Sequence, residues 1–163
     1  MILPIVKWPD KRLNTKSVEV LDSHKRQWIQ DLIDNMIETM YDAKGLGLSA
    51  IQVGHPIRLF VMDIVGCPDT VFINPVIVGW ASKRGMVNEG CLSLPGVVEE
   101  VSRFPGVSVM AVDRYGQPFA RDFTETPAQC VQHEVDHLNG ATIVDGLPSG
   151  RLEAIRLIMK ERR

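Results

Sequence analysis

Residues 126–140 read TPAQCVQHEVDHLNG, and this stretch predicts the helix around which the fold is built. It opens with a capping-box pattern, in which Thr126 is the N-cap, Pro127 is the first helical residue and a glutamine stands at the third helical position. Gly140 suits the left-handed position that follows a helix C-terminus. The sequence therefore predicts a helix over residues 127–139.

Within this helix, residues 133–137 form an H-E-x-x-H pattern. His133 and His137 lie on one helix face, about 6 Å apart along the axis, so both rings can reach one metal ion. Glu134 directly follows the first histidine, where it can act as general base on a water at the metal. Two surface histidines and an acid are the alternative interpretation. We favour the metal site, because the H-E-x-x-H motif has to lie on a helix and this segment has the capping signals of one.

A catalytic metal needs a third protein ligand, and several sources can be compared. A third histidine at the spacing H-x-x-G-x-x-H is excluded, because Ile143 stands at that position. Glu153 and Glu161 are weak candidates, since the basic residues around them predict a solvated helix surface. Cys130 shares the face of the histidines, but it lies about 10 Å from His137 along the axis, too far for a shared metal. We therefore expect Cys130 to be a small buried thiol.

Cys91 is the best remaining candidate for the third ligand. It lies in residues 88–95, NEGCLSLP, where Gly90 and Pro95 indicate an irregular segment. Such a segment can bring a thiolate and an exposed backbone amide to a site. A cysteine between glycine and leucine is usually a packing residue, so this assignment depends on the H-E-x-x-H pattern downstream.

The composition is that of a globular protein, and it excludes several classes of function. The 163 residues carry a formal charge of −2, too small for a strong attraction to nucleic acid or to a membrane surface. The 3 cysteines are odd in number and no secretory signal is present, which indicates reduced thiols rather than a disulfide framework. The apolar start of the chain is too short for a signal peptide or a membrane span. We therefore expect a cytoplasmic protein with a single domain over residues 1–163.

The rest of the chain predicts an α+β fold. An apolar stripe at spacings of three and four predicts a helix over residues 22–42, with Asp22 or Ser23 as its N-cap. A hairpin turn is predicted at residues 113–116, and a last helix follows Pro148. Short β-branched or alternating runs predict strands over residues 58–64, 71–73, 76–80, 97–102, 107–113 and 117–123. We expect antiparallel β-sheets packed around the central helix, with an N-terminal and a C-terminal helix beside them.

Three segments together resemble the peptide deformylase family: residues 45–52, GLGLSAIQ; residues 89–93, EGCLS; and residues 132–137, QHEVDH. Residues 8–13, WPDKRL, are similar to the opening of that family. The resemblance covers nearly the whole chain, and the segments follow the family's order and approximate spacing. The glycine segment also imitates a dinucleotide-binding fingerprint, but it follows a helix rather than a strand, so that interpretation fails.

The resemblance implies an enzyme that removes the formyl group from the N-terminal formyl-methionine of nascent polypeptides and releases formate. The implied metal ligands are Cys91, His133 and His137. The implied catalytic groups are the acid–base residue Glu134 and two donors to the oxyanion, the side-chain amide of Gln52 and the backbone N–H of Leu92. The resemblance also implies one divalent metal ion per chain. We expect Fe(II), with Zn, Ni or Co as alternatives, because a thiolate with two imidazoles suits each of these ions.

The resemblance also locates the substrate pocket. Residues of the glycine segment and of the cysteine segment are expected to receive the formyl-methionine side chain: Leu46, Gly47, Glu89 and Gly90. We expect Asp136 and Arg103 to form a pair that holds the helix, with a solvated salt bridge as the alternative.

Two departures from the family's pattern lie close to the site. Ser49 stands where the family usually has alanine, and we expect little change because both residues are small. Val98 stands where many bacterial members carry an arginine, and Glu99 and Glu100 follow it. This stretch flanks the peptide groove and bears on the residues that follow the formyl-methionine.

The C-terminal helix is rich in basic residues: Arg151, Arg156, Lys160, Arg162 and Arg163. In the family such a tail can touch the ribosome, although the preference of basic residues for a helix C-terminus explains much of the pattern. We expect a monomer that acts on formyl-methionyl nascent peptides, with no nucleic-acid specificity and no membrane association.

Two other functions compete with deformylation. The first is a zinc endopeptidase that uses the same helix. The second is a domain in which the metal only stabilises the fold. Glu134 and Gln52 argue against the second, because a structural metal site needs neither residue.

Overall fold

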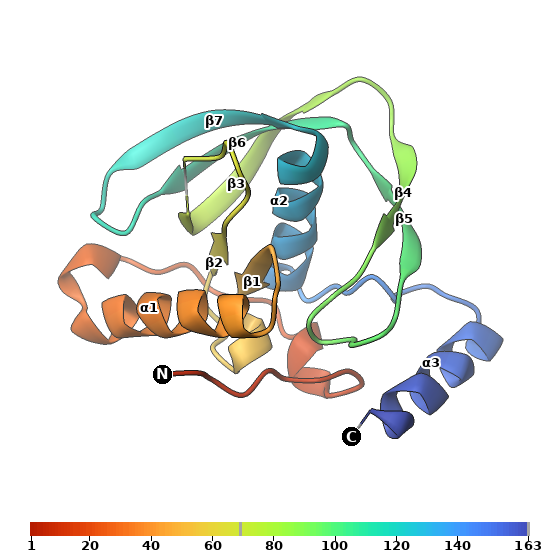
Figure 1. The fold of residues 1–163 in the computed structure, drawn as a ribbon. Helices are drawn as coiled ribbons and strands as arrows, with labels where there is room; N and C mark the ends of the chain where they lie inside the picture. The colour runs from red at the N-terminus through yellow and green to blue at the C-terminus, as the bar shows by residue number, and fades with distance from the viewer. Residues whose placement is uncertain (69, 163) are drawn as a thin grey trace.

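The computed structural model describes residues 1–68 and 70–162 (Figure 1). The helices are α1 (Gln27–Asp42), α2 (Glu125–Leu138) and α3 (Ser149–Glu161), with short 3-10 turns at Lys11–Asn14, Ser23–Lys25 and Ala50–Val53. The strands are β1 (Gly47–Ser49), β2 (Leu59–Met62), β3 (Val71–Ala81), β4 (Gly85–Glu89), β5 (Glu99–Arg103), β6 (Gly106–Val112) and β7 (Pro118–Thr124).

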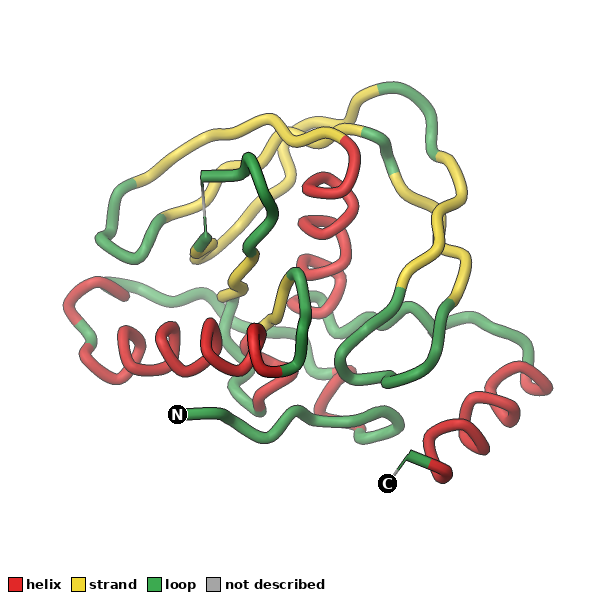
Figure 2. The backbone as a smooth tube through the Cα atoms, in the orientation of Figure 1, coloured by secondary structure: helices red, strands yellow, loops and turns green. Residues whose placement is uncertain are grey.

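Two antiparallel sheets lie around α2. One is five-stranded, in the order β1-β2-β3-β6-β7, and the other pairs β4 with β5. Figure 1 shows α2 within the curve between them, and Figure 2 shows the loop from β4 to β5 reaching toward the end of α1. The predicted α+β fold, with antiparallel sheets around the H-E-x-x-H helix, is confirmed.

One apolar face of α1 covers the first strands of the larger sheet. Its buried apolar residues recur at the predicted spacing: Ile29, Leu32, Ile33, Met36 and Met40. They share a core with Leu48 of β1 and Leu59 of β2. The predicted N-cap is wrong, because α1 begins at Gln27 after Arg26. Asp22 makes no capping bond, and its carbonyl accepts from Lys25 to close a separate 3-10 turn.

The start of α2 also differs from the prediction. Its N-cap is Thr124, which makes no side-chain capping bond, so the predicted capping box at Thr126 is wrong. The sheet fixes this end instead, since β7 pairs with β6 as far as Thr124, and the Glu125 N–H donates to the Pro105 carbonyl at 3.0 Å. The C-terminal prediction is confirmed, because Gly140 follows the helix with a φ of +80°.

The strands predicted at residues 71–73 and 76–80 form the single strand β3. Asn74 interrupts it with a φ of +50°, and the pairing with β6 shifts register there. The Asn74 side chain bonds both the N–H and the carbonyl of Val20, at 2.8 and 2.7 Å. The predicted hairpin turn is confirmed by the bond from the Gly116 N–H to the Asp113 carbonyl. The strands β1 and β4 were not predicted.

The predicted C-terminal helix is confirmed as α3, which packs on the loop before β5. Ile155 and Met159 are buried in one cluster with Leu94 and Val97 of that loop. Among the helices of residues 1–68 and 70–162, none is both long enough and apolar enough to cross a membrane.

Candidate metal centre

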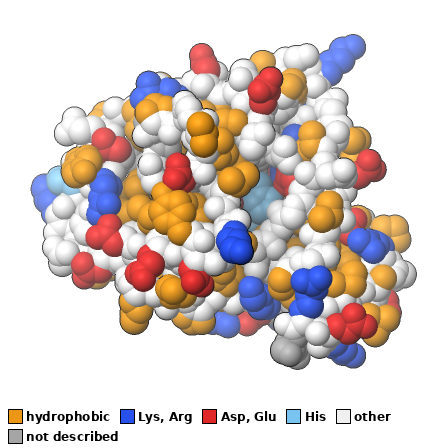
Figure 3. Space-filling view, viewed as in Figure 1, with side chains coloured by type: hydrophobic (Ala, Val, Ile, Leu, Met, Phe, Trp, Pro, Cys, Tyr) orange, Lys and Arg blue, Asp and Glu red, His pale blue; other side chains and the backbone are white. Residues whose placement is uncertain are grey.

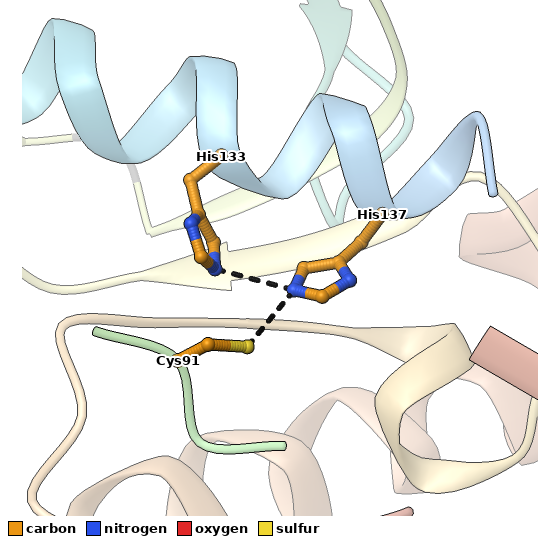
Figure 4. Close-up of side chains that lie close together, drawn as sticks. All are labelled: Cys91, His133 and His137. Atoms are coloured by element: carbon orange, nitrogen blue, oxygen red, sulfur yellow. Dashed lines mark hydrogen bonds between the residues drawn. The ribbon is translucent and has the colours of Figure 1, made fainter. Parts of the chain in front are cut away.

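The side chains of Cys91, His133 and His137 converge on one point (Figure 4). The Sγ atom of Cys91 lies 3.3 Å from Nε2 of His137, which lies 3.2 Å from Nε2 of His133. Their donor atoms all lie within 4.8 Å of one another. Both histidines come from successive turns of α2, and the loop after β4 brings the cysteine to them.

This donor set fits a divalent metal ion. Nδ1 of His133 lies 2.8 Å from a carboxylate oxygen of Glu89, so Nδ1 carries the hydrogen and Nε2 offers its lone pair to the centre. Burial holds the pKa of His137 well below its ordinary value, which keeps that ring neutral. One thiolate with two neutral imidazoles can hold Fe(II), Zn, Ni or Co.

A buried network supports His133 from behind. Arg103 donates two hydrogen bonds to Glu89, from Nε at 2.7 Å and from Nη2 at 2.9 Å. Its Nη1 donates to Asp136 at 2.6 Å, so the predicted Arg103–Asp136 pair is present. The Arg103 side chain is 7% exposed and that of Asp136 is 44% exposed, so the pair is buried at its arginine and open to solvent at its carboxylate. The network joins β4, β5 and α2 directly behind the metal centre.

The hydrogen bonds of the Glu89 carboxylate are made within this network, to Arg103 and His133. Burial by itself would raise the pKa of Glu89, but the hydrogen bonds from Arg103 and His133 outweigh it and bring the pKa to about 2. The sequence pointed to Glu89 only as a pocket residue. It does line the cavity, but its charge faces the histidine and the arginine.

Glu134 is buried beside the three converging side chains. Burial raises its pKa to about 7. Its Oε2 atom has no hydrogen-bond partner among the described residues. Gly47 permits this arrangement, because a Cβ there would lie 2.8 Å from Oε1 of Glu134 and 2.7 Å from the Cys130 sulfur.

The amide of Gln52 is held in one orientation. Its Oε1 accepts from the N–H and from the hydroxyl of Ser49, each at 3.0 Å. Its Nε2 therefore faces the Cys91 loop, where it lies 3.1 Å from Ser93 Oγ and 3.5 Å from the Cys91 sulfur. Ser49 thus fixes the direction of the glutamine amide, a role that its small size did not suggest.

A cavity of about 800 Å³ opens beside these groups. Figure 3 shows histidine atoms at the floor of a hollow near the middle of this face. The expected pocket residues all line it: Leu46, Gly47, Glu89 and Gly90. Leu92 also lines it, and its N–H makes no hydrogen bond to the residues that the structure describes. Its carbonyl accepts from Lys7 Nζ at 2.8 Å.

Cys130 lines the same cavity but is not one of the metal-ligand group. Burial, with the nearby charge of Glu134, raises the pKa of the Cys130 thiol well above its ordinary value. Cys130 is thus a partly buried thiol in the cavity wall, and it lies outside the group of possible metal ligands, as the helix geometry predicted.

Comparison with known proteins gives the family. The model of the family described as polypeptide deformylase matches residues 2–152 of this chain. The chain belongs to the polypeptide deformylase family. A peptide deformylase of Chromobacterium violaceum is 46% identical over 167 residues, which cover 99% of this chain and 96% of that protein.

Solved deformylases share the fold over almost the whole chain. The crystal structure of peptide deformylase from Ehrlichia chaffeensis has a TM-score of 0.90 at 36% identity, and the match covers 100% of this chain and 98% of that one. A peptide deformylase from Legionella pneumophila gives a TM-score of 0.91 at 39% identity, over 99% and 95% of the two chains.

The activity of the deformylase family is metal-dependent removal of the formyl group from N-terminal formyl-methionine, and it is the activity of this chain. The chain is a metalloenzyme that acts on nascent polypeptides and releases formate. Membership of this family argues against the two competing functions, the zinc endopeptidase and the purely structural metal domain.

Proposed function

We propose that the chain performs this reaction through one Fe(II) ion held by Cys91, His133 and His137. The observation that carries the proposal is the convergence of one sulfur and two imidazole nitrogens beside a buried carboxylate. When bound, the ion supplies a Lewis acid and lowers the pKa of a water molecule. A thiolate accommodates zinc, nickel and cobalt as well, and Fe(II) is proposed from the resemblance to the family.

Glu134 is proposed as the residue that moves the proton. Its carboxylate accepts a proton from the attacking water and returns it to the amine nitrogen as the bond from the formyl carbon to that nitrogen breaks. The products are formate and a free N-terminus. Its pKa of about 7 supports this role, because a group with a pKa near neutral both accepts and releases a proton readily.

Gln52 and Leu92 are proposed to stabilise the charge that develops on the formyl oxygen. The amide hydrogens of Gln52 face the Cys91 loop, and the Leu92 N–H lies one residue after the cysteine ligand. One oxyanion donor typically contributes about 3 kcal/mol to transition-state stability. Fixed donors are effective because they need no rearrangement during the reaction.

The pocket of Leu46, Gly47, Glu89 and Gly90 is proposed to receive the methionine side chain. A formyl group carries hydrogen where a longer acyl chain would continue, so a narrow site admits it and excludes an internal peptide bond. We further propose that residues 1–163 act as one catalytic domain, as a monomer in the cytoplasm.

The exposed basic residues of α3 are proposed to contact the ribosome. Arg156 and Lys160 face solvent. Arg156 donates from Nη1 to Glu153 at 3.3 Å, and the less exposed Arg151 donates from Nε to Glu99 at 2.6 Å. Arg163, which the sequence grouped with these bases, lies outside the described residues.

The proposal is tested with protein purified without oxygen and three peptides. Formyl-Met-Ala-Ser should release formate, whereas acetyl-Met-Ala-Ser should release little acetate and an unblocked longer peptide should stay intact by mass spectrometry. Exposure to air should reduce the activity if the ion is iron, because the metal and the thiolate are both open to oxidation. Comparable release of acetate and formate would refute a pocket fitted to formyl.

A further inference from the structure

Two lysines border the cavity of the proposed site. Lys7 and Lys44 both line it, and both are exposed to solvent. Lys7 comes from the N-terminal segment, and Lys44 lies in the turn after α1. In Figure 3, lysine or arginine atoms lie beside the hollow that contains the histidine atoms.

The Lys7 side chain is fixed next to Leu92, and the backbone turn that carries Lys44 lies close to the same residue. The Lys7 ammonium donates to the Leu92 carbonyl at 2.8 Å. Gly45 directly follows Lys44, and a Cβ on Gly45 would lie 2.6 Å from Cδ1 of Leu92. The turn itself is held by backbone bonds, in which the Lys44 N–H donates to Tyr41 and the Gly45 N–H to Met40. Two positive charges therefore lie around the residue that is proposed to donate to the oxyanion.

The acids of the cavity do not neutralise these lysines. Among the described residues, Glu89 and Glu134 are the acids that line it. Glu89 is bonded to Arg103 and His133, and Glu134 is only 2% exposed. Val98, where many bacterial members carry an arginine, adds an uncharged side chain to the rim. Among the residues that line the cavity, the accessible charged side chains are therefore those of Lys7 and Lys44, although the whole chain has a net charge of −2. Glu99 and Glu100, which follow Val98, are not among the lining residues.

We propose that Lys7 and Lys44 select formyl-peptides that carry an acidic side chain soon after the formyl-methionine. The inference rests on the proposed function, because a formyl group at the metal centre sends the following residues out past the rim. There a side-chain carboxylate meets the two ammonium groups. Exposed charges interact weakly, so each lysine contributes about a twofold to fivefold preference. The preference falls as salt is added.

The test compares kcat/KM for peptides that differ in one charge. Formyl-Met-Asp-Ser-amide is compared with formyl-Met-Asn-Ser-amide, and formyl-Met-Ala-Asp-amide with formyl-Met-Ala-Asn-amide. At low salt, at least one aspartate peptide should be favoured twofold or more, and the ratio should approach one at high salt. The free acid of formyl-Met-Ala-Ser, compared with its amide, reports separately on a terminal carboxylate.

Variants assign the effect to the lysines. The ratio should fall in Lys7→Gln and in Lys44→Gln, approach one in the double variant, and drop below one in Lys44→Glu. Lys160→Gln removes the same charge from α3, which does not line the cavity, and should keep the ratio of the unmodified protein.

Several results would overturn the inference. One is an aspartate ratio of one or less in the unmodified protein, and another is a ratio that persists in the double variant. Preference for the free acid without preference for aspartate would assign the lysines to a terminal carboxylate instead. Formate release from the neutral peptides shows in the same assay that the proposed function holds. No formate from any peptide would refute that function together with this inference.

Discussion

At the scale of single residues, Cys91 and Cys130 differ in position, and their positions suggest that only Cys91 can bind the metal. Cys91 lies 3.3 Å from His137 Nε2, whereas Cys130 lies by Glu134 in the cavity wall. We expect Cys91→Ser, His133→Ala and His137→Ala each to lose the metal and the activity, and Cys130→Ser to keep both. Metal analysis and formate release from the purified variants check this. Full metal content in Cys91→Ser would refute the ligand set.

Glu134 offers a second test at this scale. Glu134→Gln keeps the shape of the side chain but removes its ability to accept a proton. We expect kcat to fall by about 10²- to 10⁴-fold, which is the usual contribution of an acid–base residue. The metal should stay, because Glu134 is not one of the three converging ligands. A variant that is purified without metal would show that Glu134 supports the centre instead of moving a proton.

At the scale of elements, the Glu89–Arg103–Asp136 network couples two strands to α2, and its acid sensitivity can be predicted. The pKa of Glu89 is about 2 in the folded protein, below the ordinary value of 4.5 that it regains on unfolding. The unfolded state then binds more protons as the pH falls. The stability that Glu89 contributes is therefore present above about pH 4.5 and is lost as the pH falls toward 2.

Urea unfolding of metal-free protein between pH 7 and pH 3 checks this prediction. Glu89→Gln should be less stable than the unmodified protein at pH 7, and the difference should shrink as the pH falls. Glu100→Gln alters an exposed acid on the paired strand β5 and is the matched control. A stability difference that stays constant with pH would contradict the assignment.

The elements also show what could be predicted from the chain. The α1 stripe and the H-E-x-x-H helix follow from local periodicity, and the structure has both. Both predicted caps failed, because a 3-10 turn holds the chain before α1, and pairing of β7 at Thr124 fixes the start of α2. β1 is short and begins with Gly47, so it carries little strand signal. Helix ends that are fixed by tertiary contacts cannot be predicted from local capping patterns in the sequence.

At the scale of the whole molecule, the site depends on contacts between distant segments. The bond of Cys91 to His137 spans 46 positions, and that of Arg103 to Asp136 spans 33. Elimination and family resemblance pointed to Cys91, but nothing in the spacing linked Glu89 to His133. That link needs β4 paired with β5 and both strands placed beside α2, which only the folded chain specifies.

The contribution of α3 to the whole molecule can be measured by pairing two substitutions. Ile155 is fully buried against Leu94 and Val97, which line the substrate cavity, whereas Leu157 is 54% exposed. We expect Ile155→Ala to lower the free energy of unfolding by about 2–5 kcal/mol, and to reduce kcat/KM by loosening the cavity wall. Leu157→Ala should change both far less. Equal effects of the two substitutions in urea unfolding would refute this packing role.

The exposed bases of α3 should act on the ribosome without acting on the fold. Arg156 and Lys160 lie outside the cavity, so Arg156→Gln with Lys160→Gln should leave kcat/KM for formyl-Met-Ala-Ser within about twofold. Binding to ribosomes in co-sedimentation should weaken, and most clearly at low salt, because phosphate contacts dominate association with RNA. Ile155→Ala is the opposite control, since it should lower the stability of the fold without altering the charge of the helix. Unchanged co-sedimentation of the double variant would contradict the ribosome contact proposed for Arg156 and Lys160.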